Sequence, residues 1–72
     1  MNTGYVKVVK ADKSFGFIRA ADKKEYFFHK DDYQGNWEEL VKDFDGKIKI
    51  DVIFEPKQGL KGPRAIEITR VE

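Results

Sequence analysis

The sequence has no cysteine, only two prolines and a single histidine among its 72 residues. Without cysteine the chain can form neither a disulfide framework nor a thiolate metal site, which fits a reducing compartment. The lone histidine, His29, has no second histidine or cysteine with which to complete a metal site. We therefore expect a cytoplasmic protein that needs no metal and no cofactor.

Long apolar runs are also missing, so we expect neither a membrane span nor a signal peptide. The 14 basic and 13 acidic residues leave a net charge of only +1. Any attraction to phosphate must therefore come from how the charges are arranged, not from their sum. The aromatic content of 14% argues against disorder. We expect one monomeric domain over residues 1–72, with a narrow stability margin.

Apolar and polar residues alternate along most of the chain, which is the pattern of β-strands. One segment departs from it: Asn36 as N-cap, followed by apolar residues at helical spacing, predicts a short helix at about 37–44. The proline- and glycine-rich stretch 55–63 predicts a mobile loop. The predicted strands are YVKVV at 5–9, KSFGFIRA at 13–20, EYFFHK at 25–30, GKIKIDVIF at 46–54 and RAIEITRV at 64–71.

Five short antiparallel strands leave no unpaired edge if they close into a small barrel, so an all-β barrel is the predicted fold. The last two strands each present an apolar face to the predicted interior. The residues on these faces are Ile48, Ile50, Val52 and Phe54 in the fourth strand, and Ile66 and Ile68 in the fifth.

The second and third strands carry aromatic rings beside basic residues. A hairpin that turns near Asp22 would set Phe17 opposite Phe27 and Phe15 opposite His29. These rings would then gather on the outer face of the barrel, because the other apolar residues of both strands point the opposite way. The same register pairs Arg19 with Glu25 and directs Ile18, Tyr26 and Phe28 inward.

Exposed rings flanked by cations suit unpaired nucleic-acid bases, which stack on the rings while lysines attract the phosphates. The pattern alone leaves an alternative open, since a shifted register would bury the rings in the core. An enzyme has no support, because no nucleophile lies beside a base, and neither a phosphate cradle nor a carboxylate pair is evident.

KSFGFIR and YFFHK resemble the two RNA-binding motifs of the cold-shock domain, whose usual forms are close to K-G-F-G-F-I and V-F-V-H-F. GYVKVV resembles the opening G-x-V-K strand of that family, and KGPRAIEI its closing G-P-x-A segment. The resemblance covers nearly the whole chain. It implies a five-stranded OB-fold barrel that binds single-stranded RNA and DNA with little sequence preference. Members act as RNA chaperones, and some affect transcription termination or translation.

The resemblance also implies which residues bind nucleic acid. The family's binding positions in the two motifs are matched by Lys13, Phe15, Phe17, Phe27 and His29. Lys7 matches a basic position in the first strand. Lys61 lies in the last loop, and Arg64 lies in the strand after it. Lys30 adds a cation, and Trp37 comes from the extended segment before the fourth strand. The candidate residues are Lys7, Lys13, Phe15, Phe17, Phe27, His29, Lys30, Trp37, Lys61 and Arg64.

The chain departs from the family pattern at positions that usually carry rings. Val8 and Val9 stand where an aromatic pair is usual, and Lys30 replaces a phenylalanine. We therefore expect weaker binding with a shorter footprint and greater salt sensitivity, unless Trp37 or Tyr33 replaces a lost ring. The lost rings also favour an alternative function, a protein-interaction domain whose aromatic patch docks a peptide or another subunit.

Overall fold

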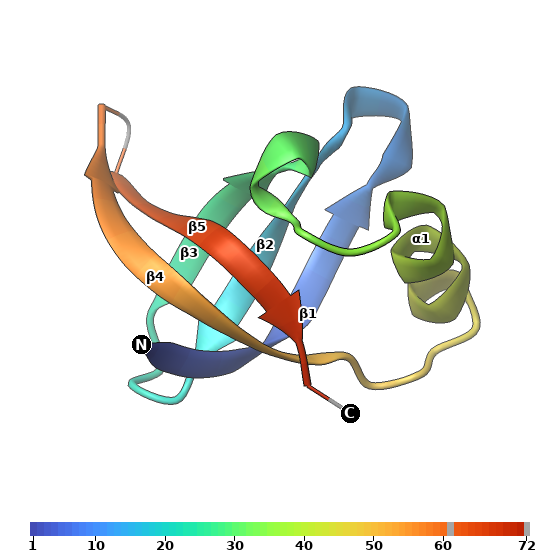
Figure 1. Ribbon diagram of the computed structural model, residues 1–72, viewed down its shortest axis with the longest axis horizontal. Coiled ribbons are helices and arrows are strands. Elements are labelled where there is room, and N and C mark those ends of the chain that lie inside the picture. Colours follow the sequence, from blue (N-terminus) through green and yellow to red (C-terminus); the bar gives the residue numbers. More distant parts are fainter. Residues whose placement is uncertain (61, 72) are drawn as a thin grey trace.

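The computed structural model describes residues 1–60 and 62–71 and shows a closed five-stranded β-barrel (Figure 1). The strands follow one another around the barrel in the order β1-β2-β3-β5-β4, which confirms the predicted all-β barrel. Neighbouring strands are antiparallel except for β3 and β5, which close the barrel in parallel. The strands are β1 (Asn2–Lys10), β2 (Phe15–Ala20), β3 (Glu25–His29), β4 (Asp51–Gly59) and β5 (Gly62–Arg70).

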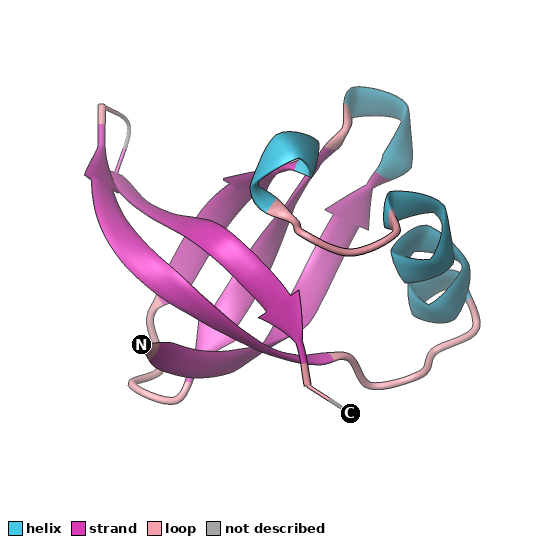
Figure 2. Cartoon of the chain, in the orientation of Figure 1, coloured by secondary structure: helices cyan, strands magenta, loops and turns pink. Residues whose placement is uncertain are grey.

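Three short helical segments connect the strands (Figure 2). Two are single 3₁₀ turns, η1 (Ala11–Lys13) and η2 (Lys30–Asp32), and the third is α1 (Trp37–Asp45). The predicted cap of α1 is confirmed, since the Asn36 side chain accepts a hydrogen bond from the Glu39 backbone N–H at 3.1 Å. Within the described part of the chain, every helix is too short to cross a membrane.

The hairpin of β2 and β3 has the predicted register. Phe17 pairs with Phe27, Phe15 with His29, and Arg19 with Glu25. The interior face of this hairpin is buried in the barrel through Ile18, Tyr26 and Phe28. The alternative in which Phe15, Phe17 and Phe27 form the core is therefore wrong.

Gly16 allows the Phe28 ring and the β1 backbone to pack closely against β2 on the inside of the barrel. A Cβ atom at this position would meet the Val8 carbonyl oxygen and would lie 2.8 Å from Cζ of Phe28. The Phe28 ring is completely buried and occupies the space that a side chain at position 16 would need. Glycine between the two outward phenylalanines of β2 therefore serves the core.

The predicted mobile loop at 55–63 is wrong, because most of it belongs to a long hairpin. β4 continues to Gly59 and β5 starts at Gly62, with pairs that include Pro56 and Ala65. β1 pairs with β4 only over residues 51–54, so Pro56 lies where β4 has a free edge and its missing N–H costs no ladder bond. Turn-forming residue types thus mark the hairpin here without interrupting its strands.

Two predicted interior positions are also wrong. Ile48 is 54% exposed and precedes β4, because Lys47 takes a left-handed conformation (φ 61°) that breaks the alternation. In β5, Glu67 also has a positive φ (49°) and is an extra residue relative to β4. This β-bulge leaves Ile66 only partly buried while Ile68 is completely buried.

Candidate nucleic-acid interface

Three phenylalanine rings lie together on the outer face of β2 and β3, and we call Phe15, Phe17 and Phe27 the ring patch. Their centroids are 5.4 to 6.1 Å apart, with Phe27 close to both of the others. Each ring remains partly exposed. The alternation of β2 and β3 holds them there, since the residues between them are buried in the core. The patch is therefore a preformed aromatic surface.

The tip of the β4–β5 hairpin borders the ring patch and encloses a hollow with it. The hollow has a volume of about 640 Å³ and is also lined by Gly59, Leu60, Gly62, Pro63 and Arg64. The hairpin projects from the barrel on the side away from α1 (Figure 1). Leu60 is fully exposed at its tip and is not among the residues predicted from the sequence. The sequence feature that could have indicated Leu60 is its place as an apolar residue in a turn flanked by Gly59 and Gly62. Lys61 lies outside the described residues, so its role stays a prediction.

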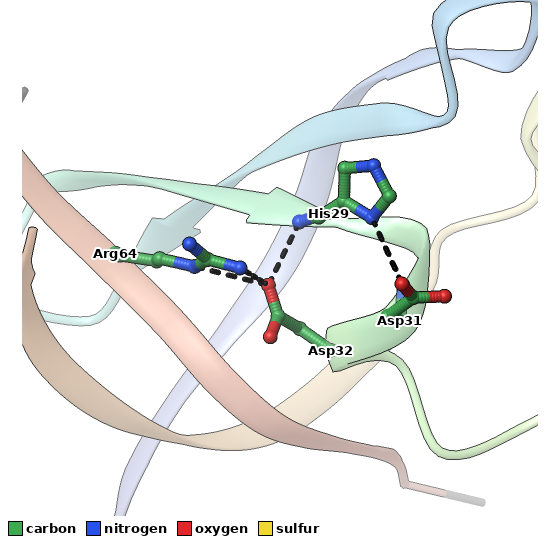
Figure 3. A network of polar contacts seen from close by, with 4 residues as sticks. All are labelled: His29, Asp31, Asp32 and Arg64. Atoms are coloured by element: carbon green, nitrogen blue, oxygen red, sulfur yellow. Dashed lines mark hydrogen bonds and ion pairs between the residues drawn. The ribbon is translucent and has the colours of Figure 1, made fainter.

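Arg64 is held in place by Asp32 (Figure 3). Asp32 Oδ2 accepts hydrogen bonds from Nε and Nη2 of Arg64, at 3.2 and 2.9 Å, and from the His29 backbone N–H at 2.9 Å. The Asp32 side chain is only 14% exposed, so its carboxylate offsets the arginine charge at close range. This pairing fixes the guanidinium at the edge of the hollow and weakens its attraction for a further anion.

His29 lies at the end of β3, beside Phe15 of the ring patch. Its Nδ1 accepts a hydrogen bond from the Asp31 backbone N–H at 3.3 Å, and the Asp31 carboxylate lies 3.7 Å from the same nitrogen. The His29 side chain is 44% exposed. The imidazole is thus oriented by η2 and remains accessible beside the patch.

Lys7 is also paired, with Glu25 on β3. Its Nζ donates to Glu25 Oε2 at 2.6 Å, and this hydrogen bond and charge lower the pKa of Glu25. Lys7 sits at a bulge of β1, because Val6 pairs with Ile18 while Val8 pairs with Phe17. The predicted binding lysine is therefore close to the ring patch, with its charge offset by a carboxylate.

The register of β1 shows which departures from the family pattern touch the ring patch. Val8 is paired with Phe17 and lies on the patch face, whereas Val9 packs against the core. The next residue on the patch face is Lys10, which is exposed and paired with Phe15. Lys10 is a cation that is not among the residues predicted from the sequence, although its two-residue offset from Val8 indicates the shared face.

Lys13 and Lys30 lie at the same end of the patch as Lys10. Both are exposed, and the Lys30 backbone N–H donates to the Ser14 carbonyl at 2.8 Å, which continues the β2–β3 ladder by one pair. The two lysines therefore extend from neighbouring strand ends, beyond Phe15 and His29. Lysine in place of a ring at position 30 gives this end of the surface positive charge.

Trp37 does not belong to the ring patch. Its ring lies edge-on to Phe28 at a centroid distance of 6.1 Å, and Phe28 points into the barrel. Tyr33 is buried in the core and offers no open face. Tyr33 therefore does not replace a missing ring. Trp37 is partly buried against the core, and base stacking by it stays a prediction.

The chain matches the family model of the 'Cold-shock' DNA-binding domain over residues 2–71. It belongs to the cold-shock domain family. It is similar to Cold shock-like protein CspB of Yersinia pestis, with 40% identity over 67 residues that cover 92% of this chain and 89% of the relative. It is also similar to Cold shock-like protein CspC of Escherichia coli K12, with 36% identity over 69 residues that cover 94% and 93%.

Membership in the cold-shock family agrees with the placement of the two motifs on adjacent strands. The chain is thus a nucleic-acid-binding protein of the cold-shock type. In this chain Lys7 and Arg64 are ion-paired, a valine lies beside Phe17, and Leu60 is exposed.

Proposed function

We propose that this cold-shock protein binds single-stranded RNA and DNA by stacking unpaired bases on the ring patch. The observation that carries the proposal is the cluster of three partly exposed phenylalanine rings, with centroids 5.4 to 6.1 Å apart, on the outside of the barrel. Stacking of a base on an aromatic side chain contributes about 1–3 kcal/mol. Because every base has a π face, such binding carries little sequence preference, and a duplex hides the faces that it needs.

Exposed lysines supply the attraction for the phosphates. Lys10, Lys13 and Lys30 lie at the Phe15 end of the ring patch, and no described ion pair involves them. We infer that His29 contributes a further ring beside Phe15. The protein would then act in the cytoplasm as a monomeric RNA chaperone, which traps unpaired strands by mass action without a cofactor.

Salt dependence tests the proposal. Labelled oligothymidylate and a mixed-sequence single-stranded RNA are titrated at low and moderate salt, with a duplex of the same sequence for comparison. We expect micromolar or tighter binding of the single strands that weakens with salt, with a slope of log K against log salt of roughly −2 for three phosphate contacts. Absence of binding by the folded protein at low salt would refute the proposal.

A second candidate function is favoured by the fully exposed Leu60 beside the ring patch. A leucine at the mouth of an aromatic hollow suits an apolar side chain of a peptide or of another subunit. Docking of this kind does not weaken with salt, because salt strengthens the burial of apolar surface. Affinity that is constant or rises with salt would therefore favour the protein partner.

Removing the carboxylate of Glu25 is expected to tighten binding to single-stranded RNA. Glu25→Gln frees Lys7 and removes a negative charge beside the patch, so we expect an affinity increase of about two- to fivefold and a steeper salt dependence. The matched control is Glu38→Gln, which removes the same charge from exposed α1 and should leave affinity unchanged. Weaker binding by Glu25→Gln would show that the carboxylate itself contacts the ligand.

A further inference from the structure

Tyr5 is an exposed ring that the function proposed above does not use. It lies on β1, is 37% exposed and is paired with Arg19 of β2. Arg19 is two residues from Phe17 on the same face of that strand, a distance of about 7 Å. The outer face of β1 and β2 therefore continues from the ring patch to Tyr5.

The surroundings of Tyr5 combine apolar hollows with cations. Nζ of Lys49 lies over the tyrosine ring, 5.7 Å from its centroid. The tyrosine forms a wall of two hollows, one of about 520 Å³ that Lys49 and Ile48 also line, and one of about 400 Å³ that Arg19 and Val71 also line. Asp51 lies 3.8 Å from the lysine amine and offsets part of its charge. Tyr5 thus lines two hollows, each of which has apolar residues, at least one cation and one carboxylate, Asp45 in the larger hollow and Asp51 in the smaller.

We propose that Tyr5, Arg19 and Lys49 form a second nucleotide subsite on the barrel, separate from the ring patch. The base of one further nucleotide stacks on Tyr5. Of the two phosphates that flank this nucleotide, one lies near the guanidinium of Arg19 and the other near the amine of Lys49. The inference rests on the proposed function, because the nucleotide belongs to the same single strand that occupies the ring patch.

The path between the two subsites supports a single continuous ligand. Val8 is paired with Phe17 and offers no ring, so stacking is interrupted there and resumes at Tyr5. The ion pair of Lys7 and Glu25 lies along this path, because Glu25 is paired with Arg19. A phosphate that crosses this point meets Arg19 and the ion pair of Lys7 and Glu25, which together carry a net positive charge. An apolar peptide would have to desolvate all three charged groups.

A length series of oligothymidylates, from three to about nine nucleotides, tests the subsite. The wild type is compared with Tyr5→Leu, which keeps an apolar side chain without a π face, and with Tyr5→Phe, which keeps the ring. For the longest oligonucleotides we expect Tyr5→Leu to lose about 5- to 150-fold in affinity, while Tyr5→Phe stays within about twofold of the wild type. For the shortest, which the ring patch alone accommodates, the three proteins should bind equally.

Charge variants give an independent measurement. Arg19→Gln and Lys49→Gln are each expected to make the salt slope shallower by about 0.7 for long oligonucleotides and to leave it unchanged for short ones. Thermal unfolding followed by circular dichroism checks that every variant is folded.

The outcomes separate this inference from the proposed function. Equal length profiles for the wild type and Tyr5→Leu would overturn the subsite while leaving stacking on the ring patch intact. A loss in Tyr5→Leu that is the same at every length would also overturn it, since Tyr5 would then support the patch itself. If the wild type bound no single strand of any length, the proposed function would fail and the subsite with it.

Discussion

Replacing Phe15 and Phe27 together with alanine is expected to lower the affinity for single-stranded RNA by roughly 30-fold or more, because two stacking faces are lost at about 1–3 kcal/mol each. The two rings are 5.4 Å apart and both contact Phe17, so their contributions are coupled and the loss need not equal the sum of the single variants. Both side chains lie outside the barrel, and the fold should survive their removal.

The measurement is a titration of labelled RNA at low salt, with circular dichroism to show that each variant is folded. The matched control is the double variant Phe15→Tyr/Phe27→Tyr, which keeps both rings and should keep most of the affinity. Unchanged affinity in a folded alanine double variant would mean that the ring patch is not the stacking platform, and the search would move to a protein partner for this face.

Phe28→Ala is expected to lower the free energy of unfolding by about 3–5 kcal/mol. The Phe28 ring is completely buried, occupies the space next to Gly16 and contacts Trp37. A domain of 72 residues has a total stability of roughly 4–11 kcal/mol, so this single cavity removes a large share of it. The variant should be largely unfolded well below the melting temperature of the wild type.

Phe27→Ala provides the matched comparison, because the two phenylalanines are adjacent and lose the same atoms. Phe27 is partly exposed and loses ring contacts worth about 0.5–1.5 kcal/mol each, so its stability should fall much less while its RNA affinity falls more. Urea unfolding, followed by circular dichroism and by Trp37 fluorescence, measures the stability of both variants. Titration of labelled RNA measures their affinity. Equal stability losses in the two variants would contradict the assignment of inner and outer faces.

The local elements of the barrel were predictable because they depend on residues close together in the chain. A short polar turn sets the register of β2 and β3, and a one-residue slip would have moved every apolar side chain to the wrong face. The helix at Trp37–Asp45 was equally predictable, since its cap and its apolar spacing lie within ten residues. The ring patch follows directly from that register.

Features that depend on departures from regular geometry were not predictable. The positive φ at Lys47 and the bulge at Glu67 changed which isoleucines are buried, and neither position carries glycine as a signal. Prolines at 56 and 63 suggested a loop, although both lie within the paired strands β4 and β5. Pro56 is tolerated because it lies at a free edge of β4. The turn propensity of proline describes only that residue's own preference. At Pro56 the free edge of β4 allows a strand in spite of it.

By itself, the sequence determined the period-two pattern, the hairpin that carries the rings and hence the aromatic surface of a cold-shock domain. Only the tertiary structure decided which charges are free to act on that surface. Arg64 and Asp32 are 32 residues apart, and Lys7 and Glu25 are 18 apart, yet both pairs are in contact. Pairing of β3 with β5 brings Arg64 to Asp32, whereas the neighbouring strands β1, β2 and β3 bring Lys7 to Glu25. Pairing of β1 with β2 places Lys10 and Tyr5 along the ring-bearing face. Charge is a local property of a side chain, but whether it is offset depends on strands that meet only in the folded barrel.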